Sequence, residues 1–196
     1  MRKHSYELKR WARWLATFIG FPLAGVAARV VAGNIDSISA AVLGGLAAGA
    51  VLGAVQAGIG GIDPGRRLRW MVATACGLAA GLAVGASAVD FQTDSTSLAT
   101  MGAVTGAFVG VAQAVSVPMR VADRLLWAAA TPLLWAGGWL ITSQVIVDTE
   151  RQHAVFGSSG ALVVSALAGV LYAVWQGTEV DPAVVAGAAT GSAVAS

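Results

Sequence analysis

Charged residues are scarce in this chain. Asp, Glu, Lys and Arg make up 11% of the residues, whereas a soluble domain carries about 25%. Hydrophobic residues make up 57%, and the mean hydropathy is +0.73. The composition excludes an ordinary water-soluble domain and is typical of an integral membrane protein.

The chain also lacks the residues on which common enzyme classes depend. Its single cysteine, Cys76, excludes an intrachain disulfide and a cysteine-based metal site. No nucleophile elbow, phosphate-binding loop, HExxH or CxxC motif is present. The interiors of the apolar segments carry no Asp, Glu or His, which argues against intramembrane catalysis and proton-coupled transport. We therefore predict that the protein is not an enzyme and needs no cofactor or metal.

Apolar runs long enough to cross a bilayer are abundant by contrast. A helix needs about 20 residues to cross a hydrocarbon core about 30 Å thick. Runs of this length lie at 14–34, 40–60, 70–89, 98–118, 125–147 and 155–176. The 25 glycines agree with this assignment, because membrane helices tolerate glycine better than soluble helices do. We predict an all-α, polytopic membrane helix bundle of about six transmembrane helices.

A repeat of 57 residues divides the chain into three related units. The threonines of the odd-numbered spans, Thr17, Thr74 and Thr131, lie 57 residues apart. Four residues of the second span return 57 positions later in the fourth: Gly45, Gly49, Gly53 and Gln56 become Gly102, Gly106, Gly110 and Gln113. The third unit has drifted, and its glutamine position falls on Val170, or on Tyr172 after a slip in register.

Each unit is therefore predicted to be a helical hairpin. A basic cytoplasmic segment at 1–13 precedes hairpins at 14–60, 70–118 and 125–176, and an Ala/Gly-rich tail follows at 177–196. Units with two spans each insert in the same orientation, so a pseudo-threefold axis along the membrane normal can relate them. The N-terminus resembles a signal peptide, but the repeat makes the first span equivalent to two later ones, so we expect it to be retained.

Basic residues gather at alternate ends of the spans. They are Arg2, Lys3, Lys9, Arg10 and Arg13, then Arg66, Arg67 and Arg69, then Arg120 and Arg124. This asymmetry predicts a plasma-membrane protein with both termini in the cytoplasm, and it indicates topology rather than a nucleic-acid partner. Five tryptophans fall at the same boundary, where we expect them to face the membrane interface: Trp11, Trp14, Trp70, Trp127 and Trp175.

Glycines spaced by four residues form stripes along several spans. Small residues at this spacing allow membrane helices to approach closely. The stripes contain Gly45, Gly49 and Gly53, then Gly77 and Gly81, then Gly102, Gly106 and Gly110. Packing within the bundle is the favoured interpretation. A docking face for another subunit or for a second copy of the chain is the alternative.

The spans contain a few polar residues at corresponding depths. We predict a hydrogen bond from Gln56 to Thr17 or Thr74, with a repeat equivalent at Gln113. Such interhelical contacts contribute about 0.6 kcal/mol on average and act as structural glue. A polar ring that lines a substrate path is the alternative interpretation of the same residues.

Arg29 is the one basic residue inside a span, near its outer end. We expect its long side chain to reach the outer interface or to pair with an acid of an outer loop. A contact with a solute or a lipid headgroup is the alternative. The outer loops carry Asp36, Asp90, Asp94, Asp148 and Glu150. We interpret these as solvated charges rather than a cation site, and His153 adds no distinctive metal-ligand spacing.

The stripes at 45–56 and 102–113, with the lead-in Trp70, Ala73 and Thr74, carry a resemblance to a known class. The pattern resembles small bacterial membrane proteins built from tandem Gly-rich hairpins, over most of residues 13–176. That class has no assigned activity, so the resemblance implies no functional residue. The size and span number are also similar to the substrate-binding membrane components of vitamin transporters, which are not built as three equal hairpins.

Two functions are compatible with these features, and the first is the favoured hypothesis. The first is a non-catalytic packing or assembly subunit of a larger membrane complex, with the lipid bilayer and other membrane subunits, or a second copy, as partners. The second is a small-solute transporter or substrate-binding membrane component. A solvent-reachable cavity lined by Gln56, Gln113 or Arg29 would favour the second. A dense bundle with a free glycine groove would favour the first.

Overall fold

The computed structural model describes residues 2–145 and 154–178, and all regular structure in these ranges is helical. Six helical stretches are long and apolar enough to cross a membrane, which confirms the prediction of six long apolar helices. The elements are α1 (Arg2–Ala16), η1 (Thr17–Ile19), α2 (Gly20–Ala32), α3 (Ile38–Ile59), η2 (Pro64–Arg66), α4 (Arg67–Ala88), α5 (Ser95–Ser116), α6 (Val121–Ser143) and α7 (Ser158–Thr178).

The first span is longer than predicted and contains a break. It is helical from Arg2 onward, so the basic N-terminal segment continues directly into the span. A short 3₁₀ turn, η1, separates α1 from α2. Pro22 accounts for this break, because it has no N–H to donate to the carbonyl of Phe18 and its ring crowds that carbonyl.

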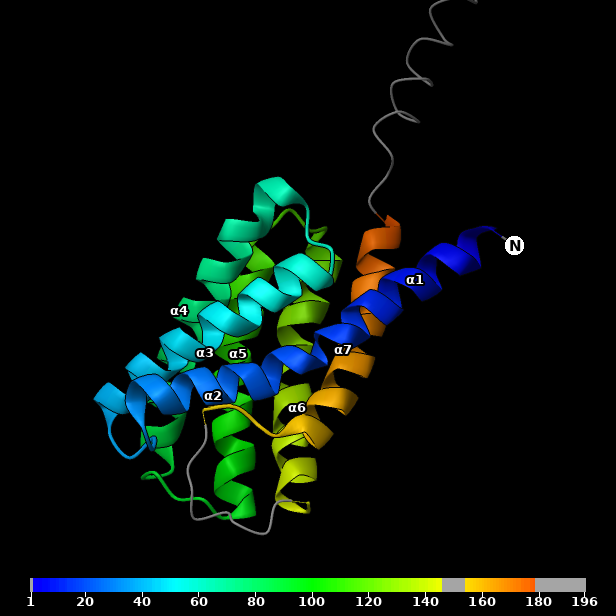
Figure 1. Cartoon of the computed structure of the whole chain (residues 1–196). Coiled ribbons are helices and arrows are strands. Elements are labelled where there is room, and N and C mark those ends of the chain that lie inside the picture. Colours follow the sequence, from blue (N-terminus) through cyan, green and yellow to red (C-terminus); the bar gives the residue numbers. More distant parts are fainter. Residues whose placement is uncertain (1, 146–153, 179–196) are drawn as a thin grey trace, which may run out of the picture.

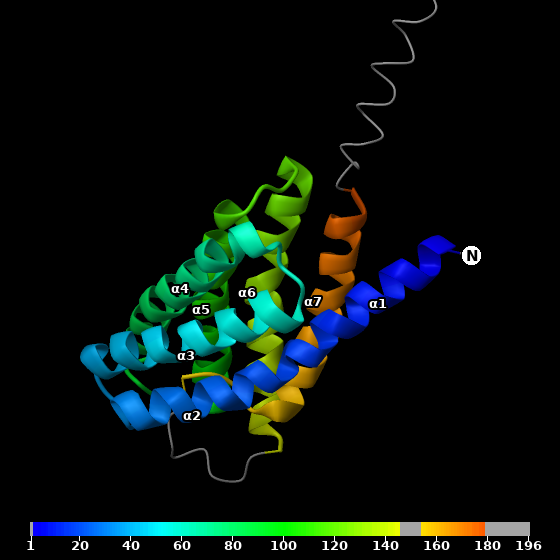
Figure 2. The same ribbon diagram turned by 45° about the horizontal axis from the view of Figure 1, so that its top comes forward.

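The helices pack in chain order, and the last one returns to the first. Each helix from α2 to α7 contacts its sequence neighbours, and α7 packs against α1. Both views show α1, η1 and α2 as one long rod that runs obliquely to α5 and α6 (Figures 1 and 2). The first turns of α1 extend beyond the rest of the bundle (Figure 1).

Large apolar side chains cover the outward faces of the helices. Val30, Leu133 and Val115 are 79%, 75% and 66% exposed, and many other valines and leucines are at least half exposed. A water-soluble protein rarely exposes apolar surface on this scale. These faces are therefore suited to contact lipid hydrocarbon, as expected for a multi-pass membrane protein.

The glycine stripes lie at helix–helix contacts inside the bundle. A Cβ added at Gly49 would lie 2.5 Å from the Cα of Ala75 in α4, a distance that real Cβ atoms do not reach. A Cβ at Gly81 would lie 2.7 Å from the Cα of Thr105, and the same close approach holds at the other stripe glycines: Gly45, Gly53, Gly77, Gly102, Gly106 and Gly110. The stripes thus bring α3 onto α4, α4 onto α5 and α5 onto α6.

Candidate functional site: an interior polar network and a lateral pocket

Three tryptophans meet inside the bundle near the predicted cytoplasmic ends of the spans. Trp14, Trp70 and Trp127 come from α1, α4 and α6, one from each predicted hairpin. Their ring centroids are 5.9, 5.5 and 6.0 Å apart, and every pair packs edge to face. We define these three side chains as the tryptophan triad. Edge-to-face packing at this separation is favourable for aromatic rings.

The position of the triad corrects the expectation that the tryptophans face the membrane interface. Trp14, Trp70 and Trp127 are almost fully buried, as is Trp175, while Trp11 is half-buried and donates its indole N–H to the carbonyl of Ala166 in α7. A buried indole N–H needs an acceptor. The glutamines supply that acceptor for two members of the triad.

The two repeat glutamines join the helices in one hydrogen-bond network. The indole Nε1 of Trp70 donates to Gln56 Oε1, and that of Trp127 donates to Gln113 Oε1, each over 3.1 Å. Gln113 Nε2 then donates to Gln56 Oε1 at 3.1 Å and to Thr74 Oγ1 at 3.0 Å. The network therefore links α3, α4, α5 and α6. The recurring separation of 14 residues between glutamine and tryptophan was the sequence signal for this pairing.

The threonine hydroxyls of the repeat donate within their own helices, and Thr74 also accepts a predicted bond from another helix. Thr17, Thr74 and Thr131 donate their hydroxyls to the carbonyls of Trp14, Trp70 and Trp127 in the preceding turn, over 2.7 to 2.8 Å. This local bond is common for threonine in helices and uses its only donor. Gln56 forms no hydrogen bond with Thr17 or Thr74 among the described residues. The predicted repeat equivalent is present, because Gln113 donates to Thr74, the pair that a 57-residue shift derives from Gln56 and Thr17.

The first unit departs from the other two at this point. Trp14 precedes its threonine by three residues, whereas Trp70 and Trp127 precede theirs by four. In a 3₁₀ turn residues three apart share a face, so the shorter spacing fits the turn at η1. Tyr172 occupies the place of the third glutamine, and its ring stacks on Trp14 at 4.2 Å.

The space beside this network is small. A void of about 20 Å³ lies between Gln56, Gln113, Thr131 and Ser165. This is enough for about one water molecule. The glutamines therefore hold helices together in this structure and do not line an open passage among the described residues.

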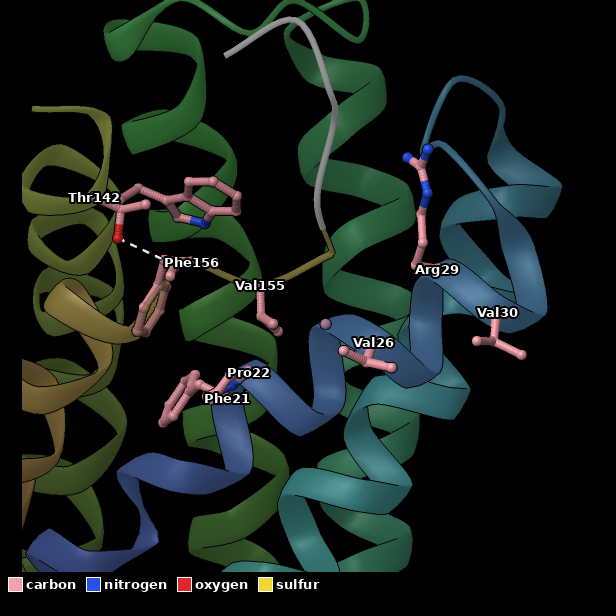
Figure 3. A pocket seen from close by; sticks show the side chains of 11 residues that line it. Phe21, Pro22, Val26, Arg29, Val30, Thr142, Val155 and Phe156 are labelled. Atoms are coloured by element: carbon pink, nitrogen blue, oxygen red, sulfur yellow. Dashed lines mark hydrogen bonds between the residues drawn. The ribbon is translucent and has the colours of Figure 1, made fainter. Parts of the chain in front are cut away.

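A much larger pocket lies toward the opposite ends of the helices. It has a volume of about 380 Å³ and lies between α2, the end of α6 and the segment that leads into α7. Its walls are formed by Phe21, Pro22, Gly25, Val26, Arg29, Val30, Trp139, Thr142, Val155, Phe156 and Gly157 (Figure 3). We name it the lateral pocket, because Val26 and Val30, two largely exposed side chains of α2, form part of its lining.

The deep wall of the lateral pocket is aromatic and ordered by contacts with the core. Phe156 stacks on Phe21 with centroids 4.7 Å apart and packs edge-on against Trp139 at 6.2 Å. The N–H of Gly157 donates to Thr142 Oγ1 at 3.1 Å, which fixes the segment before α7 to α6 (Figure 3). The pocket is thus preformed on its inner side, while Val26 and Val30 at its mouth are largely exposed.

Arg29 forms the polar edge of the lateral pocket. Its side chain is exposed and extends from α2 toward the following loop (Figure 3). Nη1 donates to Asn34 Oδ1 in that loop. The predicted pairing with an outer-loop acid is not seen in the part of the chain that the structure describes. The amide oxygen of Asn34 accepts one hydrogen bond from the guanidinium but carries no charge. Within the described residues the guanidinium therefore has no counter-charge.

The outer acids form no cation site within the described ranges. Asp36, Asp90 and Asp94 are exposed, and no group of three or more His, Cys, Asp or Glu residues gathers there. Asp94 instead caps α5, and hydrogen bonds from the hydroxyl and N–H of Ser97 lower the pKa of its carboxyl below the usual value. Asp148, Glu150 and His153 lie outside the described residues.

Arginines at the other ends of the helices bind backbone carbonyls. Arg13 Nε donates to the carbonyl of Ile59 at 3.2 Å, and Arg124 Nε donates to that of Ala114 at 3.1 Å. These carbonyls belong to the last turns of α3 and α5, where a cation also interacts favourably with the helix dipole.

No family model, curated protein or solved structure matches the chain.

Proposed function

We propose that this integral membrane protein is non-catalytic and acts as a binding component that holds a small amphiphilic solute in the lateral pocket. The observation that carries the proposal is the pocket itself, with a volume of about 380 Å³ and with Arg29 at its edge. This volume falls within the range of about 300–1,000 Å³ typical of small-molecule sites. A mostly apolar wall with few polar groups is also typical of such sites.

The pocket lining supports a role in binding rather than in chemistry. Among the described residues of its wall, Arg29 and Thr142 are the only side chains with nitrogen or oxygen hydrogen-bonding groups besides the indole of Trp139. Among these described residues there is no acid, histidine or cysteine to act as base or nucleophile. General acid–base and covalent catalysis depend on such groups.

The use of the glycine stripes favours binding over the packing-subunit alternative. That alternative drew on glycines free to receive another chain. In the structure the stripe glycines are occupied by α4, α5 and α6 of the same chain. A partner subunit would have to dock elsewhere.

One feature still favours a second candidate, an assembly subunit. The beginning of α1 projects from the bundle (Figure 1). Tyr6 and Leu8 on this projecting part are 63% and 64% exposed. A partner membrane subunit, or a second copy of the chain, would find its docking surface here rather than on a glycine groove.

We also propose a plasma-membrane topology with both termini in the cytoplasm. The described arginines of the tryptophan end, among them Arg13, Arg67 and Arg124, support this orientation through the bias of basic residues toward the cytoplasm. The near-equal spacing of the tryptophan triad, with one ring from each hairpin, supports three units around a pseudo-threefold axis.

Native mass spectrometry of the full chain, purified in mild detergent, tests the proposal. We expect the protein to carry a bound small molecule that is lost in Gly25→Leu, whose side chain would fill the pocket. Gly137→Leu is the matched control, because an added Cβ there meets nothing within 4 Å. Co-purification of other polypeptides with an empty pocket in the wild type would support the assembly subunit instead.

A further inference from the structure

We infer that the occupant of the lateral pocket is an anionic phospholipid, with an acyl chain in the apolar wedge and the phosphate on Arg29. The inference rests on the proposed binding function and specifies its ligand. It follows from where the pocket opens, from what lines it and from the charge of Arg29 at its edge.

The pocket opens on a lipid-facing side of the bundle. Val26 and Val30 form its mouth and are 62% and 79% exposed. These side chains belong to α2, whose outward face is part of the apolar surface suited to lipid. A molecule that enters from this side comes from the hydrocarbon layer, so an acyl chain is the most available occupant.

The aromatic wall suits a hydrocarbon chain. Phe21, Phe156 and Trp139 present apolar surface, and the Gly25 backbone leaves the floor of the wedge open. A Cβ added at Gly25 would lie 3.6 Å from Val155 Cγ2, at ordinary van der Waals distance, so the space there is not already filled. A polar solute would leave its own hydrogen-bonding groups unpaired against this wall.

The charge of Arg29 selects the headgroup. Only Nη1 is engaged, by Asn34, and no carboxylate of the described residues pairs with the guanidinium. A planar guanidinium binds phosphate oxygens through two parallel hydrogen bonds. Arg29 lies near the end of α2, where a lipid phosphate at the membrane surface would be within the same layer.

The test uses the full chain in nanodiscs of phosphatidylcholine with increasing phosphatidylglycerol, and photo-crosslinking of a diazirine-labelled phosphatidylglycerol to α2 and to residues 154–157. We expect Arg29→Gln to weaken phosphatidylglycerol binding about tenfold, the effect of losing one charge-assisted pair. Arg29→Lys should retain part of the preference. Arg69→Gln, an exposed arginine at the opposite end, is the charge-matched control.

Two further arms identify the source of the phosphate and the role of the wedge. Gly25→Leu should abolish crosslinking at these segments, whereas Gly137→Leu should not. Glycerol phosphate without acyl chains should fail to compete. Equal losses in Arg29→Gln and Arg69→Gln, or full competition by glycerol phosphate, would overturn the inference.

The two proposals fail in different ways. If Gly25→Leu leaves every bound species in the native mass spectrum unchanged, the lateral pocket is not a binding site and both proposals are wrong. If Gly25→Leu removes a bound species that is not a phospholipid, and Arg29→Gln leaves phosphatidylglycerol binding unchanged, the binding function holds and only the lipid inference is wrong.

Discussion

The two ends of the bundle are packed in opposite ways. At the tryptophan end, three rings and two glutamines leave a void of about 20 Å³. At the other end, the wedge beside α2 encloses about 380 Å³. The same six helices therefore combine a closed, hydrogen-bonded end with an open, apolar one.

The two ends differ in packing because some helix–helix contacts contain close-packed glycines and others do not. Stripe glycines bring α3, α4, α5 and α6 together in sequence. The described glycines of α7 pack against helices other than α2. Gly160 lies against α6, and Gly169 lies against Trp11 of α1. No described glycine of α7 lies against α2, and these two helices make little contact with each other. The pocket thus forms where the drifted third unit closes on the first.

The largest expected effect is the loss of the close-packed interfaces. Gly49→Leu should prevent α3 from docking on α4, because even its Cβ would overlap the Ala75 backbone. Gly49→Ala alone should destabilise the fold by about 1–3 kcal/mol. The unfolding midpoint in detergent mixtures measures this loss. Gly58→Leu, where an added Cβ meets nothing within 4 Å, should unfold at the wild-type midpoint or slightly above it, because leucine has the higher helix propensity. Equal midpoints for the two leucine variants would contradict the packing account.

The second effect tests the closed end directly. Gln113→Leu removes the hydrogen bonds to Gln56, Thr74 and Trp127, and leaves the indole N–H of Trp127 without its acceptor. A buried donor left unpaired costs about 1–3 kcal/mol, so we expect a loss of about 2 kcal/mol in unfolding free energy. Gln92→Leu in an exposed loop is the control. A double-mutant cycle with Gln56→Leu should show coupling, and strict additivity would argue against one network.

The sequence predicted the helices well and the site only in part. Runs of apolar residues give the number and approximate bounds of the spans, because the bilayer thickness fixes their length. The repeat also identified Gln56, Gln113 and Thr74, which the structure brings into one network. The tryptophan partner of each glutamine was missed, because tryptophans near a span end usually face the interface rather than the interior.

The lateral pocket could not be predicted from pattern alone. Its walls come from α2, α6 and the segment before α7, which are far apart in the chain. The space between the first and third units depends on the side-chain volumes where they meet. The repeat does not predict which residues face each other at that contact. Arg29 was identified as exceptional by its charge, but Phe156 and Trp139, which line the same pocket, carried no distinguishing signal.

The third effect is a gain in stability at an interface that is already closed. The hydroxyl of Thr105 in α5 is buried and has no hydrogen-bond partner among the residues that the structure describes. Thr105→Val keeps the shape of the side chain and removes this unpaired group, so we expect stability to rise by up to about 1 kcal/mol. Thr131→Val, which removes a paired hydroxyl, should not raise stability. A loss in Thr105→Val would mean that the hydroxyl has a partner in the membrane, such as a bound water.

The smallest expected effect is the change in stability when a helical glycine is replaced by alanine. Its sign should differ between the lateral pocket and the close-packed interface. Gly25 in the lateral pocket and Gly49 in the close-packed interface are both helical glycines. At Gly25 a Cβ reaches only van der Waals contact with Val155, so Gly25→Ala adds no overlap and gains helix propensity of up to about 1 kcal/mol. Paired unfolding measurements should therefore find Gly25→Ala neutral or stabilising and Gly49→Ala destabilising. Destabilisation of similar size by both would show that α2 packs as tightly as α3, and would leave no room for a ligand beside it.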